Sequence, residues 1–415
     1  MLNVFRISFR NLVRYGRRTL LTSSLITLGV VAVLLFVAVA GSFKALMIGQ
    51  FTDGVLGNLE VHRKGYVASI DNSPLNLNMQ PALVKKIEQV LDKTPQIDAY
   101  SERLKFGAMF SNFTETTSVR ANGVDPAREA ATIPLMPGRL IEGSKAPPLL
   151  KPGEILIPAL LAQGLKVKLG DTVVLVATNL QGSMNAKTFT VRGVLDSASG
   201  PSGRDAFIDI NDARSLLRVT QPEVNEIAIR LKDPAQLDRV DAQLKGAFAG
   251  ILNAQGKPLL EVHTWAELSP FSSVVSMIDL LTVFIKIMLV SIVLISVLNV
   301  MIMAVYERIR EIGTISAIGT PPGRIMAIFL GEGLLLGIGG AALGTALSLA
   351  VIWALNLHKI VFNFARAQGL VLAPSVSAAD VATIVGMVVL MALIASLQPA
   401  WKASRMDPVR ALGHV

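Results

Sequence analysis

The chain has 415 residues, of which 52% are hydrophobic and only 17% charged, with a formal net charge of +9 and no cysteine. About a quarter of the residues of a soluble domain are charged, so this composition indicates a membrane protein. The lack of cysteine excludes disulfides and thiolate metal sites.

The first 18 residues form a basic, amphipathic segment. Apolar residues such as Phe5, Phe9 and Val13 are interleaved with arginines at helical spacing, and the segment contains no acidic residue. This pattern predicts a cytoplasmic helix over 1–18 that lies in the membrane interface. The same arginines also form the positive flank that orients a following transmembrane helix, and the two interpretations are compatible.

Four apolar windows are long enough to cross a bilayer, which takes about 20 residues. They predict transmembrane helices over 19–42, 271–306, 325–356 and 379–400, the second of which begins with an extracytoplasmic stalk. The first window follows a basic segment, as the apolar part of a signal peptide does. It is longer than such a part and no clear cleavage site follows it, which favours a retained helix.

The segment 43–270 has the pattern of a folded domain in water. Two stretches carry amphipathic helical periodicity, while VNEIAIRL and KTFTVRGV alternate as strands do. The middle, 125–205, is richer in Gly and Pro and lacks a long helical pattern. We predict an α+β domain whose core consists of 43–124 and 206–265, with a β-rich insertion over 125–205.

Lysine and arginine are unevenly distributed among the connecting segments. They are frequent before the first window, in 307–324 and in the tail 401–415, whereas 357–378 holds only Lys359 and Arg366. Since basic residues favour the cytoplasmic side, both termini and 307–324 are predicted to be cytoplasmic and the large domain periplasmic. This placement accounts for part of the positive charge without nucleic acid as a partner.

No catalytic or metal-binding motif is found in the sequence. It contains no Walker A loop, no H-E-x-x-H and no G-x-S-x-G, and its four histidines are scattered. We therefore predict a non-catalytic chain without a cofactor or a metal.

One acidic residue lies inside the third window. Glu332 follows Arg324 by eight residues, about 12 Å along a helix, which places its carboxylate within the bilayer. An intramembrane acid can relay protons. The charge-free parts of the other windows (19–43, 287–306 and 381–401) hold no acid or histidine that would accept the proton, so we favour a bond to a neighbouring helix or to the interface.

The third window is also rich in glycine. Gly333–Gly337 and Gly340–Gly344 both have the G-x-x-x-G spacing, which lets helix backbones approach closely in lipid. We predict that these glycines form a packing interface. The spacing does not distinguish packing within the chain from packing across a dimer.

The segment after the second window resembles the signature of the type VII, or mechanotransmission, ABC permeases, a family that includes macrolide exporters, lipoprotein-releasing permeases and the cell-division permease. The matching parts are ERIREIG (307–313), AIGTP (317–321), the early Glu332 and the glycine-rich stretch. PAWKASRMDPVRAL (399–412) is similar to the C-terminal motif of the family. Pro321-Pro322 departs from the pattern and predicts a sharper turn.

The resemblance implies a mechanism. A separate cytoplasmic ATP-binding cassette subunit, which carries the ATP and Mg²⁺, is expected to dock on a coupling helix over 307–324 and to move the helices and the outer domain of this chain. The expected contact residues are Glu307, Arg308, Arg310, Glu311, Ile312, Gly313, Ile315, Ile318 and Gly319. The sequence leaves open whether the charged residues or the isoleucines face the partner.

The resemblance also implies further partners and a location. These are a second permease copy or a paralogue in a dimer, membrane lipids, and a periplasmic cargo or adaptor protein, for a multi-pass protein of the bacterial inner membrane. We favour release of lipoprotein or other lipophilic cargo, because GNLEVHRKGY (57–66) looks like a segment of the releasing permeases. Macrolide or peptide efflux, control of a cell-wall hydrolase, and a receptor or scaffold independent of ATP remain as alternatives.

Overall fold

The computed structural model describes residues 2–72, 74–196, 204–253, 255–358, 360–364, 367–408 and 411. Lys359 and Arg366, which entered the prediction of orientation, lie outside the described residues, as do positions 197–203 of the predicted insertion and positions 409, 410 and 412–415 of the predicted tail. The chain divides into two compact units: a helical unit (1–45, 274–362 and 369–415) and an outer domain (46–273 with 363–368).

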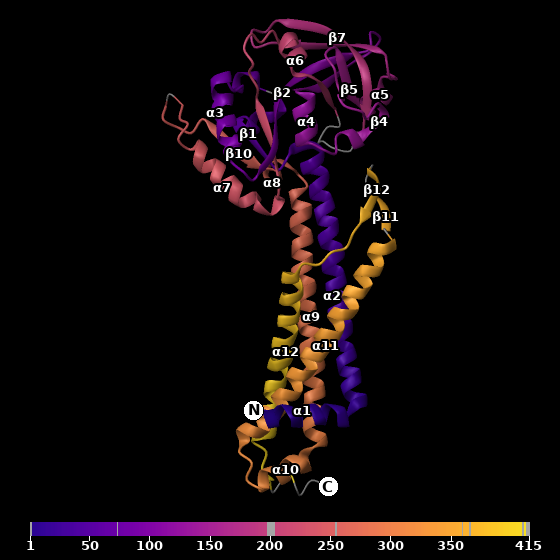
Figure 1. Cartoon of the computed structure of the whole chain (residues 1–415), viewed down its shortest axis with the longest axis vertical. Coiled ribbons are helices and arrows are strands. Elements are labelled where there is room, and N and C mark those ends of the chain that lie inside the picture. Colours follow the sequence, from indigo (N-terminus) through magenta and orange to yellow (C-terminus); the bar gives the residue numbers. More distant parts are fainter. Residues whose placement is uncertain are drawn as a thin grey trace. The chain divides into compact units, whose positions relative to one another are not determined.

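Four helices among the described residues are long and apolar enough to span a membrane. They are α2 (Gly16–Phe51), α9 (Ser272–Glu307), α11 (Pro322–His358) and α12 (Ala378–Ser404) (Figure 1). The shorter elements beside them are α1 (Leu2–Arg14), α10 (Ile309–Ala317) and the paired strands β11 (Ile360–Phe364) and β12 (Ala367–Leu372). The predicted fold class is confirmed: four membrane-spanning helices, with an α+β domain inserted between the first and the second.

The first spanning helix is longer than the predicted 19–42. With 36 residues α2 extends over about 54 Å, whereas the hydrocarbon core of a bilayer is about 30 Å thick. The helix continues through Lys44, whose Nζ lies 2.7 Å from a carboxylate oxygen of Asp279 on α9. The predicted helix over 1–18 is also divided, since α1 ends at Arg14 and α2 begins at Gly16.

The coupling helix is shorter than the predicted 307–324. Glu307 is the last residue of α9, and α10 covers only Ile309–Ala317. Gly319 follows with a φ of +92°, a left-handed conformation that favours glycine, and Pro322 is the first residue of α11. The Gly and Pro residues thus form a turn between two helices.

The outer domain is built on one ten-stranded sheet. Its order is β10-β1-β9-β2-β3-β8-β5-β7-β4, and β6 pairs with both β2 and β7. The strands are β1 (Leu59–Arg63), β2 (Ile97–Ser111), β3 (Thr116–Val124), β4 (Leu140–Gly143), β5 (Glu154–Pro158), β6 (Thr172–Thr178), β7 (Met184–Leu195), β8 (Asp205–Asp209), β9 (Glu226–Leu231) and β10 (Leu260–Thr264). The helices are α3 (Pro81–Asp92), α4 (Pro126–Thr132), α5 (Ala159–Gly164), α6 (Ile210–Leu217), α7 (Leu237–Phe248) and α8 (Trp265–Leu268).

The predicted insertion, 125–205, shares this sheet with the predicted core. The 15-residue β2 is long enough to pair with β9 through its first half and with β6 through its last residues. β5 pairs with β8 on the other side. A small separate hydrophobic cluster that includes Leu140, Leu156 and Leu195 packs beside the main one. The sequence pattern located the β-rich stretch but could not show that its strands extend the same sheet.

Candidate functional site

The segment around α10 presents two different faces. The side chains of Arg308 and Ile312 are buried, and so is Gly313. Ile315 and Ile318 are 41% and 80% exposed, and the remaining predicted contact residues are also exposed: Glu307, Arg310, Glu311 and Gly319. The predicted isoleucine strip is therefore divided, because Ile312 packs into the core of the helical unit.

Arg308 lies inside the helical unit rather than on its surface. One of its terminal nitrogens donates a hydrogen bond of 2.8 Å to Oε1 of Glu332 on α11. Its guanidinium also lies over the ring of Tyr15, 4.3 Å from the centroid. Arg308 is the residue before the first turn of α10, where the chain leaves α9, so its side chain projects into the junction between these helices. The prediction that Arg308 contacts a partner does not agree with this position.

Glu332 connects three helices through one carboxylate. Its Oε1 accepts the hydrogen bond from Arg308 at the start of α10 and another, 2.7 Å long, from the amide of Asn11 on α1. Only 2% of the side chain is exposed. This is the bond to neighbouring helices that the sequence favoured over proton transfer, although α1 was not foreseen as a partner.

The glycine motifs of α11 pack against two different helices of the same chain. A Cβ added to Gly337 would lie 2.7 Å from the Cβ of Ala392 on α12, and one on Gly333 would collide with Ser396 of α12. A Cβ on Gly340 would meet Ile26 of α2 at 2.6 Å, and one on Gly344 would meet Val30 at 2.7 Å. Each G-x-x-x-G pair thus forms one contact, and both contacts lie within the chain.

Gly340→Ala is expected to destabilise the helical unit by about 1–3 kcal/mol, since its Cβ would press against the branched Cβ of Ile26, which lies 2.8 Å away and has little freedom to move. Gly339→Ala is the matched control, because nothing lies within 4 Å of its added Cβ and alanine favours a helix. Thermal unfolding of the full chain in detergent compares the two. Equal melting temperatures would contradict this packing of α2 on α11.

A cluster of buried charges in the outer domain was not predicted. The strand register places His62 of β1 opposite Glu226 of β9, and Glu226 opposite Arg103 of β2. Arg103 donates two hydrogen bonds, of 2.8 and 3.1 Å, to Glu129 on α4 and one of 2.8 Å to Glu226. The Nζ of Lys105 lies 2.6 Å from the Glu226 carboxylate.

The charges in this cluster compensate one another. Burial alone lowers the pKa of His62, but its contacts with Glu226 and Glu60, each at 3.3 Å, outweigh burial and raise the pKa to about 9. Burial disfavours the charged form of Glu226 too, but Lys105, His62 and Arg103 hold its pKa well below the usual range. Three carboxylates (Glu60, Glu129 and Glu226) therefore face three cations (His62, Arg103 and Lys105).

Part of the cluster has the donor types of a metal site. Ligand atoms of Glu60, His62 and Glu226 lie within 4.8 Å of one another. A divalent cation there would have to displace Lys105 and Arg103, which already bond the carboxylate of Glu226. The arrangement fits an internal salt-bridge network better than a metal centre.

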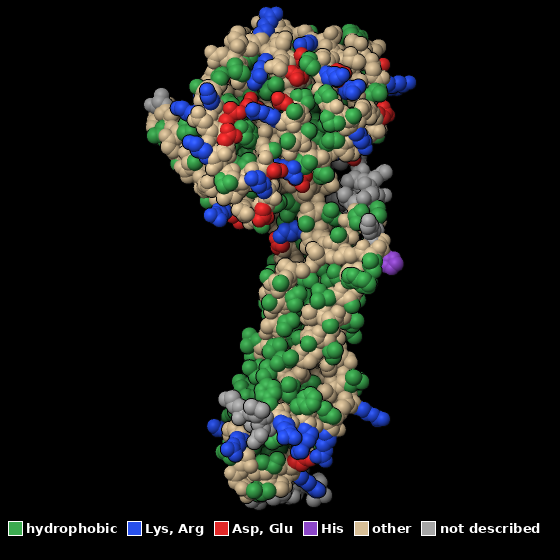
Figure 2. All heavy atoms as spheres, viewed as in Figure 1, with side chains coloured by type: hydrophobic (Ala, Val, Ile, Leu, Met, Phe, Trp, Pro, Cys, Tyr) green, Lys and Arg blue, Asp and Glu red, His purple; other side chains and the backbone are tan. Residues whose placement is uncertain are grey.

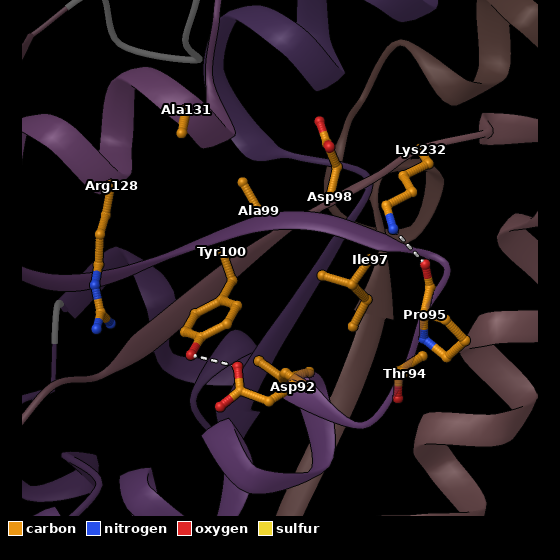
Figure 3. Close-up of a pocket in the computed structure, with 11 residues that line it drawn as sticks. Asp92, Thr94, Pro95, Ile97, Asp98, Ala99, Tyr100, Arg128, Ala131 and Lys232 are labelled. Carbon is orange, nitrogen blue, oxygen red and sulfur yellow. Dashed lines mark hydrogen bonds between the residues drawn. The ribbon is translucent and has the colours of Figure 1, made fainter.

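A pocket of about 390 Å³ opens between the C-terminal end of α3, the start of β2 and α4 (Figure 3). Its polar groups bond one another: the hydroxyl of Tyr100 donates to Asp92, and Lys232 donates to the carbonyl of Pro95. The guanidinium of Arg128 lies 5.5 Å from the centre of the Tyr100 ring. Because these groups already have partners within the domain, the pocket offers little to a polar ligand.

Family models match most of the chain. The MacB-like periplasmic core domain matches residues 19–247, and the FtsX-like permease C-terminal domain matches residues 283–408. The stretch between the two matches, 248–282, contains the end of the outer domain and the start of α9.

Curated relatives are similar over different lengths. The lipoprotein-releasing system transmembrane protein LolC of Haemophilus influenzae is 25% identical over 63% of this chain and 64% of its own length. LolC of Neisseria meningitidis serogroup B is 24% identical over 95% of this chain and 94% of its own length. The pyoverdine export ATP-binding/permease protein PvdT of Pseudomonas putida is 40% identical, but over only 28% of this chain and 16% of its own length.

Proposed function

Because the chain belongs to the ABC transporter permease family that combines a MacB-like periplasmic core domain with an FtsX-like C-terminal domain, we propose that it transmits motion from a separate cytoplasmic ATPase to its periplasmic domain. In this proposal the chain itself is not catalytic, and ATP and Mg²⁺ are bound by the partner. In this proposal the chain lies in the inner membrane of a bacterium, with both termini in the cytoplasm. A second permease, either a copy or a paralogue, completes the transporter.

The observation that best supports this proposal is that α10 has one face buried in the helical unit and one exposed face. Ile312 is held in the core of the helical unit, while Ile315 and Ile318 expose apolar surface beside the charged Glu311. A short helix held in this way can transmit the movement of a docked protein to α9 and α11, the two helices that it connects. Exposed apolar side chains with charges around them are typical of a docking surface.

Ile318→Asp is expected to weaken the binding of the ATPase subunit at least tenfold, because an apolar anchor at such a contact contributes about 1.4 kcal/mol or more. Co-purification of the ATPase with the full chain from membranes measures the effect. Leu252→Asp is the matched control, since Leu252 is similarly apolar and exposed but lies in the outer domain. Recovery of no ATP-binding cassette protein with the wild-type chain would contradict the proposal.

Charge reversal separates this proposal from a receptor or scaffold independent of ATP. Glu311→Lys alters the charged half of the exposed face of α10, so it is expected to slow association with the ATPase and to lower ATP hydrolysis by the complex. A receptor or scaffold would tolerate the change. An adjacent gene for an ATP-binding cassette protein would be a further mark of the permease.

For the cargo we propose lipoproteins, because the relatives that align with most of this chain are named for lipoprotein release. Small-molecule export, suggested by the name of the pyoverdine relative, rests on a match to only 16% of that protein. Mass spectrometry of what co-purifies with the full chain decides between them. Acylated proteins are expected, and their absence together with a bound small molecule would favour export.

A further inference from the structure

Helix α1 has three faces with different chemistry. Its buried face, with Ser8 and Asn11, packs on α11. At about 100° per residue, the exposed apolar side chains of Phe5, Phe9 and Val13 form a second stripe along the helix. A third stripe, next to the apolar one, is formed by the exposed Arg6, Arg10 and Arg14, and the exposed Arg17 follows at the start of α2.

An apolar stripe beside a row of arginines matches the two layers of a membrane interface. The apolar side chains enter the boundary of the acyl chains, and the arginines extend to the level of the headgroups. Lys and Arg side chains gather at the end of the helical unit that contains α1 and α10 (Figure 2).

We propose that the arginine stripe of α1 is a binding surface for anionic phospholipid headgroups. Arg6 and Arg10 form no ion pair with any acidic residue in the described part of the chain, and Arg14 has only a long contact of 3.9 Å with Glu311. The first 18 residues contain five arginines and no acidic residue. A guanidinium can bond two phosphate oxygens at once, which suits a phosphodiester better than the choline of a zwitterionic lipid.

The buried face of α1 connects this lipid surface to α10. Ser8 donates a 2.9 Å hydrogen bond to the carbonyl of Ile328 on α11, and Asn11 donates to Glu332, the partner of Arg308. Tyr15 lies beneath the guanidinium of the same Arg308. A change in the depth or tilt of α1 is therefore passed to the start of the helix that we propose as the ATPase contact.

Because the chain contains no cysteine, one introduced cysteine can be labelled specifically. Val13→Cys, at an exposed position of the apolar stripe, carries a bimane fluorophore in the full chain reconstituted into vesicles. Brominated phosphatidylglycerol and brominated phosphatidylcholine are compared as quenchers. Stronger quenching by phosphatidylglycerol is expected. Each arginine near an anionic membrane raises the affinity for that membrane about fivefold before screening by salt. Loss of two arginines, in Arg6→Gln with Arg10→Gln, should therefore reduce the preference for phosphatidylglycerol over phosphatidylcholine on the order of tenfold.

The control for lost charge is Lys85→Gln with Lys86→Gln, which removes two exposed positive charges from α3 of the outer domain. This pair is expected to leave the preference unchanged. Equal quenching by the two lipids, or a preference that survives loss of Arg6 and Arg10, would overturn the lipid surface and leave α1 as a positive flank that only orients the chain.

A second measurement tests the connection to α10 and rests on the proposed function. The ATPase rate of the complex is expected to be several-fold higher in vesicles with phosphatidylglycerol than in phosphatidylcholine alone, and Asn11→Leu should reduce this difference without changing the quenching ratio. Equal rates in the two lipids would overturn the connection. If no ATPase binds the chain, the proposed function fails, while the quenching experiment still decides the lipid surface.

Discussion

Arg103→Met is expected to lower the stability of the outer domain by about 3–5 kcal/mol, one of the largest effects that a single substitution can have in this chain. Arg103 is only 2% exposed, and it bonds Glu129 and Glu226 and lies 3.6 Å from Glu60. Methionine fills a similar volume but leaves these carboxylates with two of their three cations. Thermal unfolding of the full chain in detergent should show a melting transition lowered by about 10 °C.

Arg128→Met is a closely matched control. Arg128 also contacts two carboxylates, Glu88 at 3.0 Å and Glu102 at 3.1 Å, and it lies on α4 next to Glu129. Its side chain is 45% exposed, however, so water compensates for the lost contacts and the expected cost is below about 1 kcal/mol. If both variants melt at the same temperature, burial does not control the strength of these contacts and our account of the cluster is wrong.

A second substitution tests whether the cost of losing Arg103 comes from the unpaired carboxylates. Glu129 receives two hydrogen bonds from Arg103. Arg103→Met combined with Glu129→Met removes one of the stranded negative charges and is expected to recover part of the lost stability, because apolar replacements of buried pairs are often tolerated. A double variant less stable than Arg103→Met would indicate that Glu129 is stabilised by other groups.

The cluster of buried charges could not be predicted, because the sequence around Glu60 and His62 has the alternating pattern of a strand with one solvent-exposed face. Glu60 and His62 alternate with Leu59 and Val61, which usually places the polar pair in water. In the structure both faces of β1 are buried, and on its polar face Glu60 lies 3.6 Å from Arg103 of β2. The available signal in the sequence was a charged residue on each of three strands, β1, β2 and β9. Only the register of strand pairing shows that these charged residues lie next to one another.

The four transmembrane helices, by contrast, were predictable because the bilayer imposes a simple rule of length and charge. Apolar windows predicted all four, the third of them interrupted by Glu332, and the largest error lies at the end of the first, where α2 continues past Lys44 to Phe51. The glycine spacing likewise predicted close packing. It could not identify Ile26 and Ala392 as the neighbours, since that depends on how the helices are arranged around α11.

A short helix within 307–324 was predicted and is present as α10, but the face that it buries was not predicted. Sequence periodicity over nine helical residues leaves the choice of buried face open, and an arginine next to a membrane helix usually points to water. Glu332 reverses that expectation, because a carboxylate buried in α11 requires a cation and Arg308 is within reach. The intramembrane acid and the arginine of the coupling segment, considered separately in the sequence, form one pair.

Arg308→Gln is therefore expected to be more damaging than any substitution on the exposed face of α10, with a cost of about 3–5 kcal/mol in the helical unit. Without Arg308 the buried carboxylate of Glu332 keeps, among the residues that the structure describes, only the hydrogen bond from Asn11. Arg324→Gln is the control, since Arg324 is exposed at the start of α11 and its loss removes the same charge from the same connection. Its expected cost is within about 0.5 kcal/mol, and thermal unfolding in detergent compares the two.

The double variant Arg308→Gln with Glu332→Gln should be more stable than the sum of the single effects predicts, because it leaves no unpaired charge in the junction.

The functional consequence of Arg308→Gln differs from that of Ile318→Asp. Ile318 is exposed and Arg308 is buried, so Ile318→Asp should weaken binding of the ATPase at least tenfold, whereas Arg308→Gln should retain binding and lose cargo release at least tenfold. If Arg308→Gln instead loses binding of the ATPase, Arg308 belongs to the docking surface. If Arg308→Gln melts at the same temperature as Arg324→Gln, the ion pair with Glu332 does not hold α10 in place. Retained binding with lost release would mean that the anchored face of α10 passes the movement on.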